Sequence, residues 1–141
     1  MTLQPVHATA VARHTPEGWR AVLLTGPSGA GKSDLALRLV GMGWRLVGDD
    51  YVHVFASGGR LFASPVPTIE GRMEVRGVGI TSRHSVGPVA VALVVDLAPG
   101  APDRLPEPAH RAFDGLRIPL LTLDPREASA GEKVAAALAM L

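Results

Sequence analysis

The stretch Gly26-Pro27-Ser28-Gly29-Ala30-Gly31-Lys32-Ser33 matches the pattern G-x-x-x-x-G-K-[ST] at every fixed position. The apolar run 21–24 before it predicts a buried strand, and residues 34–42 after it predict a helix. Glycines let backbone N–H groups turn inward around an anion, and a helix N-terminus adds partial positive charge at the same place. We therefore expect a phosphate-binding loop (P-loop), in which Lys32 reaches the terminal phosphates of a nucleotide and the Ser33 hydroxyl binds Mg²⁺.

The composition limits the classes of protein to which the chain can belong. Of its 141 residues, 47% are hydrophobic and 19% charged, which is typical of one globular domain over residues 1–141. The formal net charge of +1 predicts neither a nucleic-acid partner nor a membrane-surface partner. The absence of cysteine excludes disulfides, thiol catalysis and cysteine-based zinc sites. Residues 1–12 lack the pattern of a secretion signal, so we expect a cytoplasmic protein.

Apolar runs separated by turn residues predict the other elements. The expected strands are 6–13, 19–25, 45–48, 52–56, 60–63, 89–97 and 116–123. The run 89–97 is rich in β-branched residues, which is typical of a strand buried on both faces. The capping-box spacing from Ser129 to Glu132 predicts a last helix that continues to Leu141. Residues 68–80 combine charges with glycines, so we expect a loop at the site or a solvated turn there rather than a core element.

Two adjacent carboxylates are the main candidates for chemistry. Asp49 and Asp50 follow the short apolar strand 45–48, which places them at the carboxyl edge of the sheet beside the P-loop. One of them can hold Mg²⁺, directly or through water, and the other can accept a proton from an attacking hydroxyl. The alternative is an acidic turn that only ends a strand.

Glu74 and His7 are further candidates. Glu74 is the next acidic residue of interest, because hard cations prefer carboxylate oxygens. Arg72 and Arg76 flank it, and they either pair with it or bind a phosphorylated product. His7 lies on the first expected strand, where a histidine either serves catalysis or has a structural role.

Three stretches together resemble the HPr kinase/phosphorylase family. They are GPSGAGKSD at 26–34, RLVGDD at 45–50 and MEVRGVGI at 73–80. The third is the most specific, because the family carries the signature (L/M)-E-(I/V)-R-G-(L/V)-G-I. The order and spacing of the three stretches also fit. The resemblance covers most of the chain, but only the C-terminal catalytic domain of the family.

The resemblance implies a fold, an activity and partners. The fold is α/β, a P-loop domain with a mixed central sheet that is related to phosphoenolpyruvate carboxykinase. Family members use ATP or pyrophosphate to phosphorylate a serine of the phosphocarrier protein HPr, and many reverse the reaction with inorganic phosphate. The resemblance therefore implies ATP or pyrophosphate and Mg²⁺ as cofactors, an HPr-like carrier as substrate, and a homo-oligomer, commonly a hexamer.

The resemblance also assigns roles by position. Lys32 matches the phosphate-binding lysine, and Ser33 and Glu74 match magnesium ligands. The cofactor-binding residues are those of the P-loop: Gly26, Pro27, Ser28, Gly29, Ala30, Gly31, Lys32 and Ser33.

The catalytic roles carry over in the same way. Asp50 matches the acid/base, which accepts a proton in the kinase direction and donates it in the reverse direction. Asp49 beside it would support the metal or orientation. His7 matches a histidine that opens the first strand of the family domain. Arg104, in the short stretch 103–105 (DRL), resembles an active-site arginine.

The chain departs from the family pattern in two late segments. The glycine-rich insert that usually follows the signature is missing, since Ile80 is followed quickly by the strand 89–97. The V-P-V-x-x-G-R segment, which is tied to dephosphorylation, appears only as IPLLTLDPR at 118–126.

Two other functions stay open. A small-molecule P-loop kinase would usually carry an arginine-rich lid after a later helix, and the sequence shows none. A non-catalytic nucleotide-sensing module would keep residues 26–33 but would not need Asp49, Asp50 and Glu74.

Overall fold

The computed structural model describes residues 5–100 and 103–141. The elements follow in the order β1 (Pro5–His7), β2 (Thr9–Thr15), β3 (Gly18–Thr25), α1 (Lys32–Gly41), β4 (Arg45–Gly48), β5 (Tyr51–Ser57), β6 (Arg60–Pro65), the 3₁₀ turn η1 (Pro67–Ile69), β7 (Arg72–Val75), β8 (Gly79–Ser82), β9 (Val89–Leu97), β10 (Ala109–Phe113), β11 (Leu116–Leu123) and α2 (Ala130–Ala139). None of the described helices is both long and apolar enough to cross a membrane.

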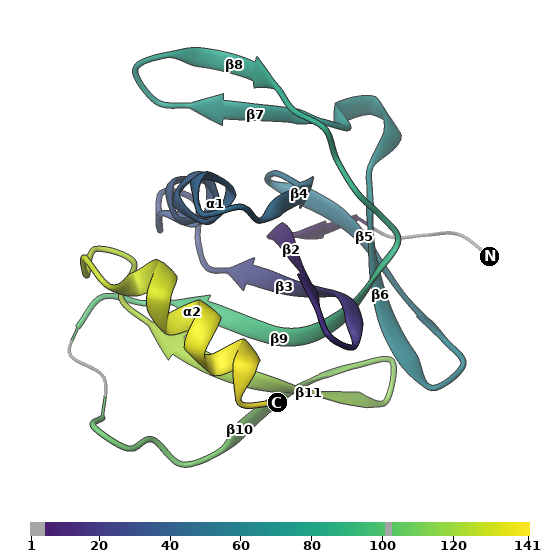
Figure 1. The fold of residues 1–141 in the computed structure, drawn as a ribbon, viewed down its shortest axis with the longest axis vertical. Helices are drawn as coiled ribbons and strands as arrows, with labels where there is room; N and C mark the ends of the chain where they lie inside the picture. Colours follow the sequence, from purple (N-terminus) through teal and green to yellow (C-terminus); the bar gives the residue numbers. More distant parts are fainter. Residues whose placement is uncertain (1–4, 101–102) are drawn as a thin grey trace.

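A curled mixed sheet forms the centre of the molecule, and β7 and β8 form a separate hairpin (Figure 1). β9 is the central strand, as its β-branched run predicted. It pairs in parallel with β3 and with β11, and its first two residues pair antiparallel with β6. Beyond β3 the sheet continues through β2 to β4, and beyond β6 it continues through β5 to β1. The predicted α/β class with a mixed central sheet is confirmed.

Two apolar cores lie on the two faces of this sheet. The first contains residues of α1, α2 and β7 packed on Val22, Leu24 and Val95. The second lies where the curled sheet and the β10–β11 hairpin close over Leu23 and Val94. Successive side chains of β3 and β9 point alternately into the first and the second core, so both strands are buried on both faces.

The structure corrects two expectations at the level of the strands. The expected strand 6–13 is divided, because β1 pairs with β5 whereas β2 pairs with β3 and β4. The expected loop 68–80 instead forms β7 and the start of β8, in a hairpin in which Met73 is completely buried in the first core.

Two smaller features near the end of the chain also differ from expectation. The strand β10 was not predicted, because AHRAF has neither an apolar run nor a clear alternation. Ser129 does stand at the N-cap of α2, but its side chain makes no capping hydrogen bond, so the capping-box prediction is wrong in its detail.

Candidate active site

The P-loop connects β3 to α1 and lies against two neighbouring segments. Gly26 has φ 148°, and a Cβ atom there would lie 3.2 Å from the carbonyl oxygen of Leu97 at the end of β9. Gly31 has φ 101°, and a Cβ atom there would lie 3.2 Å from Cγ of Pro125. Glycine is needed at both positions, since other residues would be strained and crowded. The loop is therefore fixed at the carboxyl edge of the two parallel strands β3 and β9.

The side chain of Lys32 reaches back across the loop. Its Nζ atom donates hydrogen bonds to the carbonyl oxygens of Gly26 at 2.7 Å and Pro27 at 2.9 Å. The residue is only 6% exposed. Phosphate oxygens would offer this ammonium group charged acceptors, which form stronger hydrogen bonds than carbonyl groups. The binding of phosphate by Lys32 stays a prediction.

Asp49 is joined directly to the P-loop. Its Oδ1 atom accepts a hydrogen bond from the Ser33 hydroxyl at 2.6 Å and another from the Thr9 hydroxyl at 3.0 Å. Asp49 is buried, so its carboxylate faces the loop rather than solvent. The expectation that residues after β4 lie beside the P-loop is borne out by this contact.

Asp50 occupies the centre of a tight turn. Its φ is 70°, and the N–H group of Tyr51 donates to the carbonyl oxygen of Asp49 at 2.8 Å, as in a γ-turn. Gly48 permits the turn, because a Cβ atom there would lie 2.6 Å from Cγ1 of Val52. Strained backbone of this kind is concentrated at functional sites. The turn sends the two adjacent carboxylates in different directions.

His7 holds the carboxylate of Asp50. Its Nε2 atom lies 3.0 Å from Oδ1 of Asp50, so a proton on Nε2 is donated to the carboxylate. The imidazole ring also lies 5.1 Å from the ring of Tyr51, measured between centroids. The side chain of Asp50 is 62% exposed, which leaves it accessible to a substrate. The structure thus brings His7 and Asp50 together.

Thr9 links the two aspartates and was missed by the sequence analysis. Its hydroxyl oxygen accepts a hydrogen bond from the backbone N–H of Asp50 at 3.1 Å while its proton goes to Asp49. A threonine at the start of a strand gives no sequence signal of such a role. The register of β2 beside β4 creates it.

The oxygen atoms of Ser33 and Asp49 fit a magnesium ion. Mg²⁺ is usually held by one or two carboxylates together with substrate phosphates and water, rather than by a complete protein cage. No group of three or more His, Asp or Glu side chains able to hold a metal occurs in residues 5–100 and 103–141. A hydroxyl and a carboxylate 2.6 Å apart beside a phosphate-binding loop are the donors such an ion requires.

No hydrogen bond or ion pair joins Glu74 or Arg104 to these residues in the described part of the chain. Glu74 follows the buried Met73 on β7 and is exposed, in register with the exposed Ile80 of β8. Neither neighbouring arginine forms an ion pair with it among the described residues. Arg104 is exposed in the irregular segment before β10. The roles of Glu74 and Arg104 stay predictions.

The late segment 124–127 forms a wall of the P-loop. Pro125 packs against Gly31, and Arg38 of α1 donates hydrogen bonds to the carbonyl oxygens of Pro125 and Glu127. The Arg126 side chain donates hydrogen bonds to Asp124, and the backbone N–H groups of Arg126 and Gly100 donate to it as well. These hydrogen bonds, that of the Arg126 side chain most of all, hold the pKa of Asp124 well below its usual range. These bonds fix the loop that touches the P-loop.

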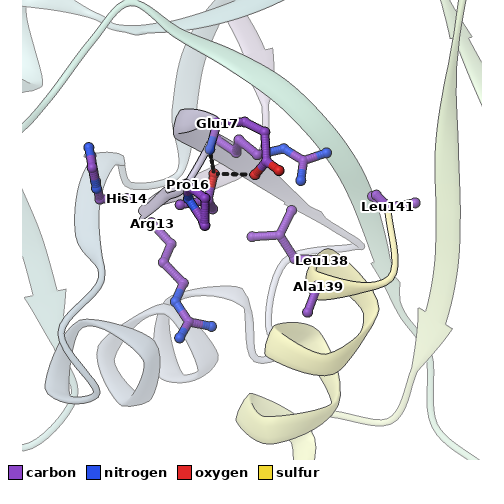
Figure 2. Close-up of a pocket in the computed structure, with 9 residues that line it drawn as sticks. Arg13, His14, Pro16, Glu17, Leu138, Ala139 and Leu141 are labelled. Atoms are coloured by element: carbon purple, nitrogen blue, oxygen red, sulfur yellow. Dashed lines mark hydrogen bonds between the residues drawn. The ribbon is translucent and has the colours of Figure 1, made fainter.

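A surface pocket of about 350 Å³ lies elsewhere (Figure 2). It is formed by the β2–β3 turn and the end of α2, at the opposite end of β3 from the P-loop. Arg13, His14 and Glu17 line it from one side, and Leu138 and Leu141 from the other. It contains none of the candidate site residues.

Comparisons with known proteins identify the family of the chain. The family model described as HPr Serine kinase C-terminal domain matches residues 19–93, more than half of the chain. The P-loop, both aspartates and Glu74 lie inside the match, whereas His7 and Arg104 lie outside it.

Individual relatives match parts of the chain. The HPr kinase/phosphorylase of Limosilactobacillus reuteri (strain DSM 20016) is 39% identical over 90 residues, covering 58% of this chain and 28% of the relative. That of Clostridium botulinum (strain Eklund 17B / Type B) is 48% identical over 59 residues, covering 42% of this chain and 19% of the relative. The matched part of the chain thus spans less than a third of the length of these curated relatives.

A solved structure covers nearly the whole chain. The HPr(Ser) kinase/phosphatase from Coxiella burnetii superposes with a TM-score of 0.79 at 21% identity, covering 97% of this chain and 95% of that one. At this identity the likeness establishes the fold. The family match over residues 19–93 shows that the chain belongs to the HPr Serine kinase C-terminal domain family.

Proposed function

We propose that this chain is a protein-serine kinase that transfers a phosphoryl group from Mg-ATP, or from pyrophosphate, to a serine of an HPr-type phosphocarrier. The observation that carries the proposal is one hydrogen-bonded chain. It runs from Ser33 of the P-loop through Asp49, Thr9 and Asp50 to His7. The nucleotide-binding part and the acidic part of the site are thereby joined.

The structure supports different roles for the two aspartates. Asp49 is buried and bonded to the Ser33 hydroxyl, so it suits the metal side of the site. Asp50 is exposed and bonded to His7, so a serine on the surface of a folded protein could reach it. We assign proton acceptance to Asp50 and orientation of its carboxylate to His7.

The proposed transfer needs no covalent enzyme intermediate. The serine oxygen attacks the γ-phosphorus in line, its proton passes to Oδ of Asp50, and the bond from the γ-phosphorus to the β–γ bridging oxygen breaks to release ADP. Lys32 leaves the Gly26 and Pro27 carbonyl groups to bind the phosphates. Bound at Ser33 and Asp49, Mg²⁺ would neutralise part of the phosphate charge.

The direct test is phosphoryl transfer to the carrier. The purified chain is incubated with Mg-ATP labelled at the γ-phosphate and with the HPr-type carriers of the host, and the modified residue is mapped by mass spectrometry. We expect one phosphoserine, and no label on a carrier whose target serine is replaced by alanine. Label only on a sugar or nucleoside would favour a small-molecule kinase. ATP binding without transfer to any acceptor would favour a nucleotide-sensing module.

Reversal, assembly and location extend the proposal. Addition of inorganic phosphate to the phosphorylated carrier tests the phosphorylase direction, with pyrophosphate as the product. Light scattering tests the proposed homo-oligomer, a hexamer by family resemblance. We propose a cytoplasmic location with no nucleic-acid or membrane partner, which cell fractionation would check.

A further inference from the structure

A second polar group lies across β3 from the acidic turn. We call Thr25, Asp96 and Arg111 the Thr25 cluster. Thr25 is the last residue of β3 and directly precedes Gly26 of the P-loop. Asp96 lies beside it, because the parallel strands β3 and β9 are in register at these two residues. Arg111 comes from β10, far away in the sequence.

One hydrogen bond and one ion pair hold the guanidinium of Arg111 in place. Its Nη1 atom donates to the Thr25 hydroxyl oxygen at 3.0 Å, and that hydroxyl donates to Oδ1 of Asp96 at 2.9 Å. Nη2 of Arg111 lies 3.9 Å from the same carboxylate oxygen. Thr25 is 7% exposed, whereas the side chains of Arg111 and Asp96 are each 36% exposed. The guanidinium is therefore fixed on its inner side and open on its outer side.

Arg111 has unused hydrogen-bond donors beside the start of the P-loop. A guanidinium carries five N–H donors, and within the described chain Arg111 makes one hydrogen bond. Lys32, which in a P-loop reaches the β- and γ-phosphates, bonds to the carbonyl groups of Gly26 and Pro27. These are the two residues that follow Thr25. Arg111 thus contacts the residue that directly precedes the loop, and Lys32 contacts the first two residues of the loop.

We propose that Arg111 binds the terminal phosphates of the nucleotide or pyrophosphate, and that Thr25 and Asp96 are positioning residues that hold its guanidinium at the start of the P-loop. The inference rests on the proposed function, in that it extends the phosphate site described there. The planar fork of a guanidinium suits two phosphate oxygens, and its charge is independent of pH in the working range.

The test is calorimetric titration of the full chain with Mg-pyrophosphate, Mg-ATP and AMP. We expect Arg111→Gln to weaken pyrophosphate and ATP binding about 10- to 100-fold, the range for hydrogen bonds to charged groups, and to leave AMP binding unchanged. Arg117→Gln is the matched control. Arg117 pairs with Ala112 across the β10–β11 hairpin whereas Arg111 pairs with Ile118, so the two arginines lie on opposite faces.

Thr25→Val separates positioning from charge. It removes the hydroxyl but no charge, so pyrophosphate binding should weaken by less than in Arg111→Gln. The double variant should bind no more weakly than Arg111→Gln alone, because both changes remove the same interaction. Circular dichroism checks the folding of each variant. If Arg111→Gln is unfolded, Thr25→Val decides the question. Weaker binding of pyrophosphate with unchanged binding of AMP supports the inference, and unchanged binding of both ligands overturns it.

The outcomes separate this inference from the proposed function. Wild-type binding of pyrophosphate by Arg111→Gln, with weakened binding by Lys32→Ala, would overturn the role of Arg111 alone. Wild-type binding by both variants would overturn the phosphate site and this inference with it. An equal loss for AMP and pyrophosphate would also overturn the inference, since Arg111 would then not act on the terminal phosphates.

Discussion

The Asp49–Asp50 turn and Glu74 are two acidic parts of the candidate site that are held in different ways. The turn connects two strands of the main sheet, and its carboxylates are hydrogen-bonded to Ser33 and His7. Glu74 lies on the β7–β8 hairpin outside that sheet (Figure 1). Its exposed side chain is placed through the packing of Met73 into the first core.

This difference suggests which part of the site is organised in advance. A turn between paired strands inherits its position from their register, and hydrogen bonds then fix the direction of each carboxylate. An exposed residue on a two-stranded hairpin has only local pairing and one buried neighbour to fix it. We therefore expect the turn to keep its geometry without ligand, and Glu74 to contribute only when nucleotide and metal are bound.

Lys32→Ala should have the largest effect on phosphoryl transfer, because both acidic parts of the site act on phosphates that the P-loop binds. Transfer should fall by about 10³-fold in kcat/KM, since a donor aimed at the developing phosphate charge is lost. ATP affinity, measured by calorimetry, should fall as well. Lys133→Ala, which changes the only other lysine, is the control. Normal binding and turnover by Lys32→Ala would show that the loop does not hold the phosphates.

Asp50→Asn should have the next largest effect and tests the turn directly. We expect kcat to fall by about 10²-fold or more through loss of the proton acceptor, with ATP binding unchanged. Asparagine tolerates the left-handed backbone of Asp50, so the turn should persist.

Asp114→Asn is the matched control for that variant. Asp114 is exposed in the β10–β11 turn and also has positive φ, 48° against 70° for Asp50. The Asp114→Asn variant should transfer phosphate at the wild-type rate. A wild-type rate for Asp50→Asn itself would remove the base assignment.

Glu74→Gln tests the hairpin side of the comparison. If Glu74 helps to hold the metal only in the loaded site, activity at limiting Mg²⁺ should fall by about 10-fold and recover at higher Mg²⁺. Rates measured across a magnesium titration give the answer, with the exposed Glu107→Gln as control. A loss as large as that of Asp50→Asn, without recovery, would mean that the hairpin is as well organised as the turn.

Asp124→Asn should have the smallest effect on phosphoryl transfer, because Asp124 lies outside both acidic parts of the site. Hydrogen bonds from Arg126 and Gly100 lower the pKa of Asp124 in the folded state, so this group stabilises the fold above the ordinary pKa of an aspartate. Asp124→Asn should lower Tm by a few degrees at neutral pH. The difference from wild type should shrink as pH falls below about 4. A difference in Tm between the variant and the wild type that is as large below pH 4 as at neutral pH would contradict this account.

The contacts that the sequence analysis missed are those with long separations. The bonds of Thr9 to Asp49, Asp96 to Thr25 and Arg111 to Thr25 join residues 40, 71 and 86 positions apart. Asp96 could have been found by the rule that identified Asp49 and Asp50, since it also lies at the carboxyl end of an apolar strand. Arg111 could not, because β10 has no recognisable pattern.

Local pattern was enough to identify the P-loop, the helix after it, the buried central strand and the acidic pair, because each depends on neighbouring residues alone. Local pattern could not predict that Asp49 and Asp50 have different hydrogen-bond partners. Asp49 faces Ser33 and Asp50 faces His7 because the β4–β5 turn meets β1, β2 and the P-loop in the folded sheet. The arrival of Arg111 beside Thr25 likewise depends on how the sheet curls and pairs, and no short stretch of sequence encodes it.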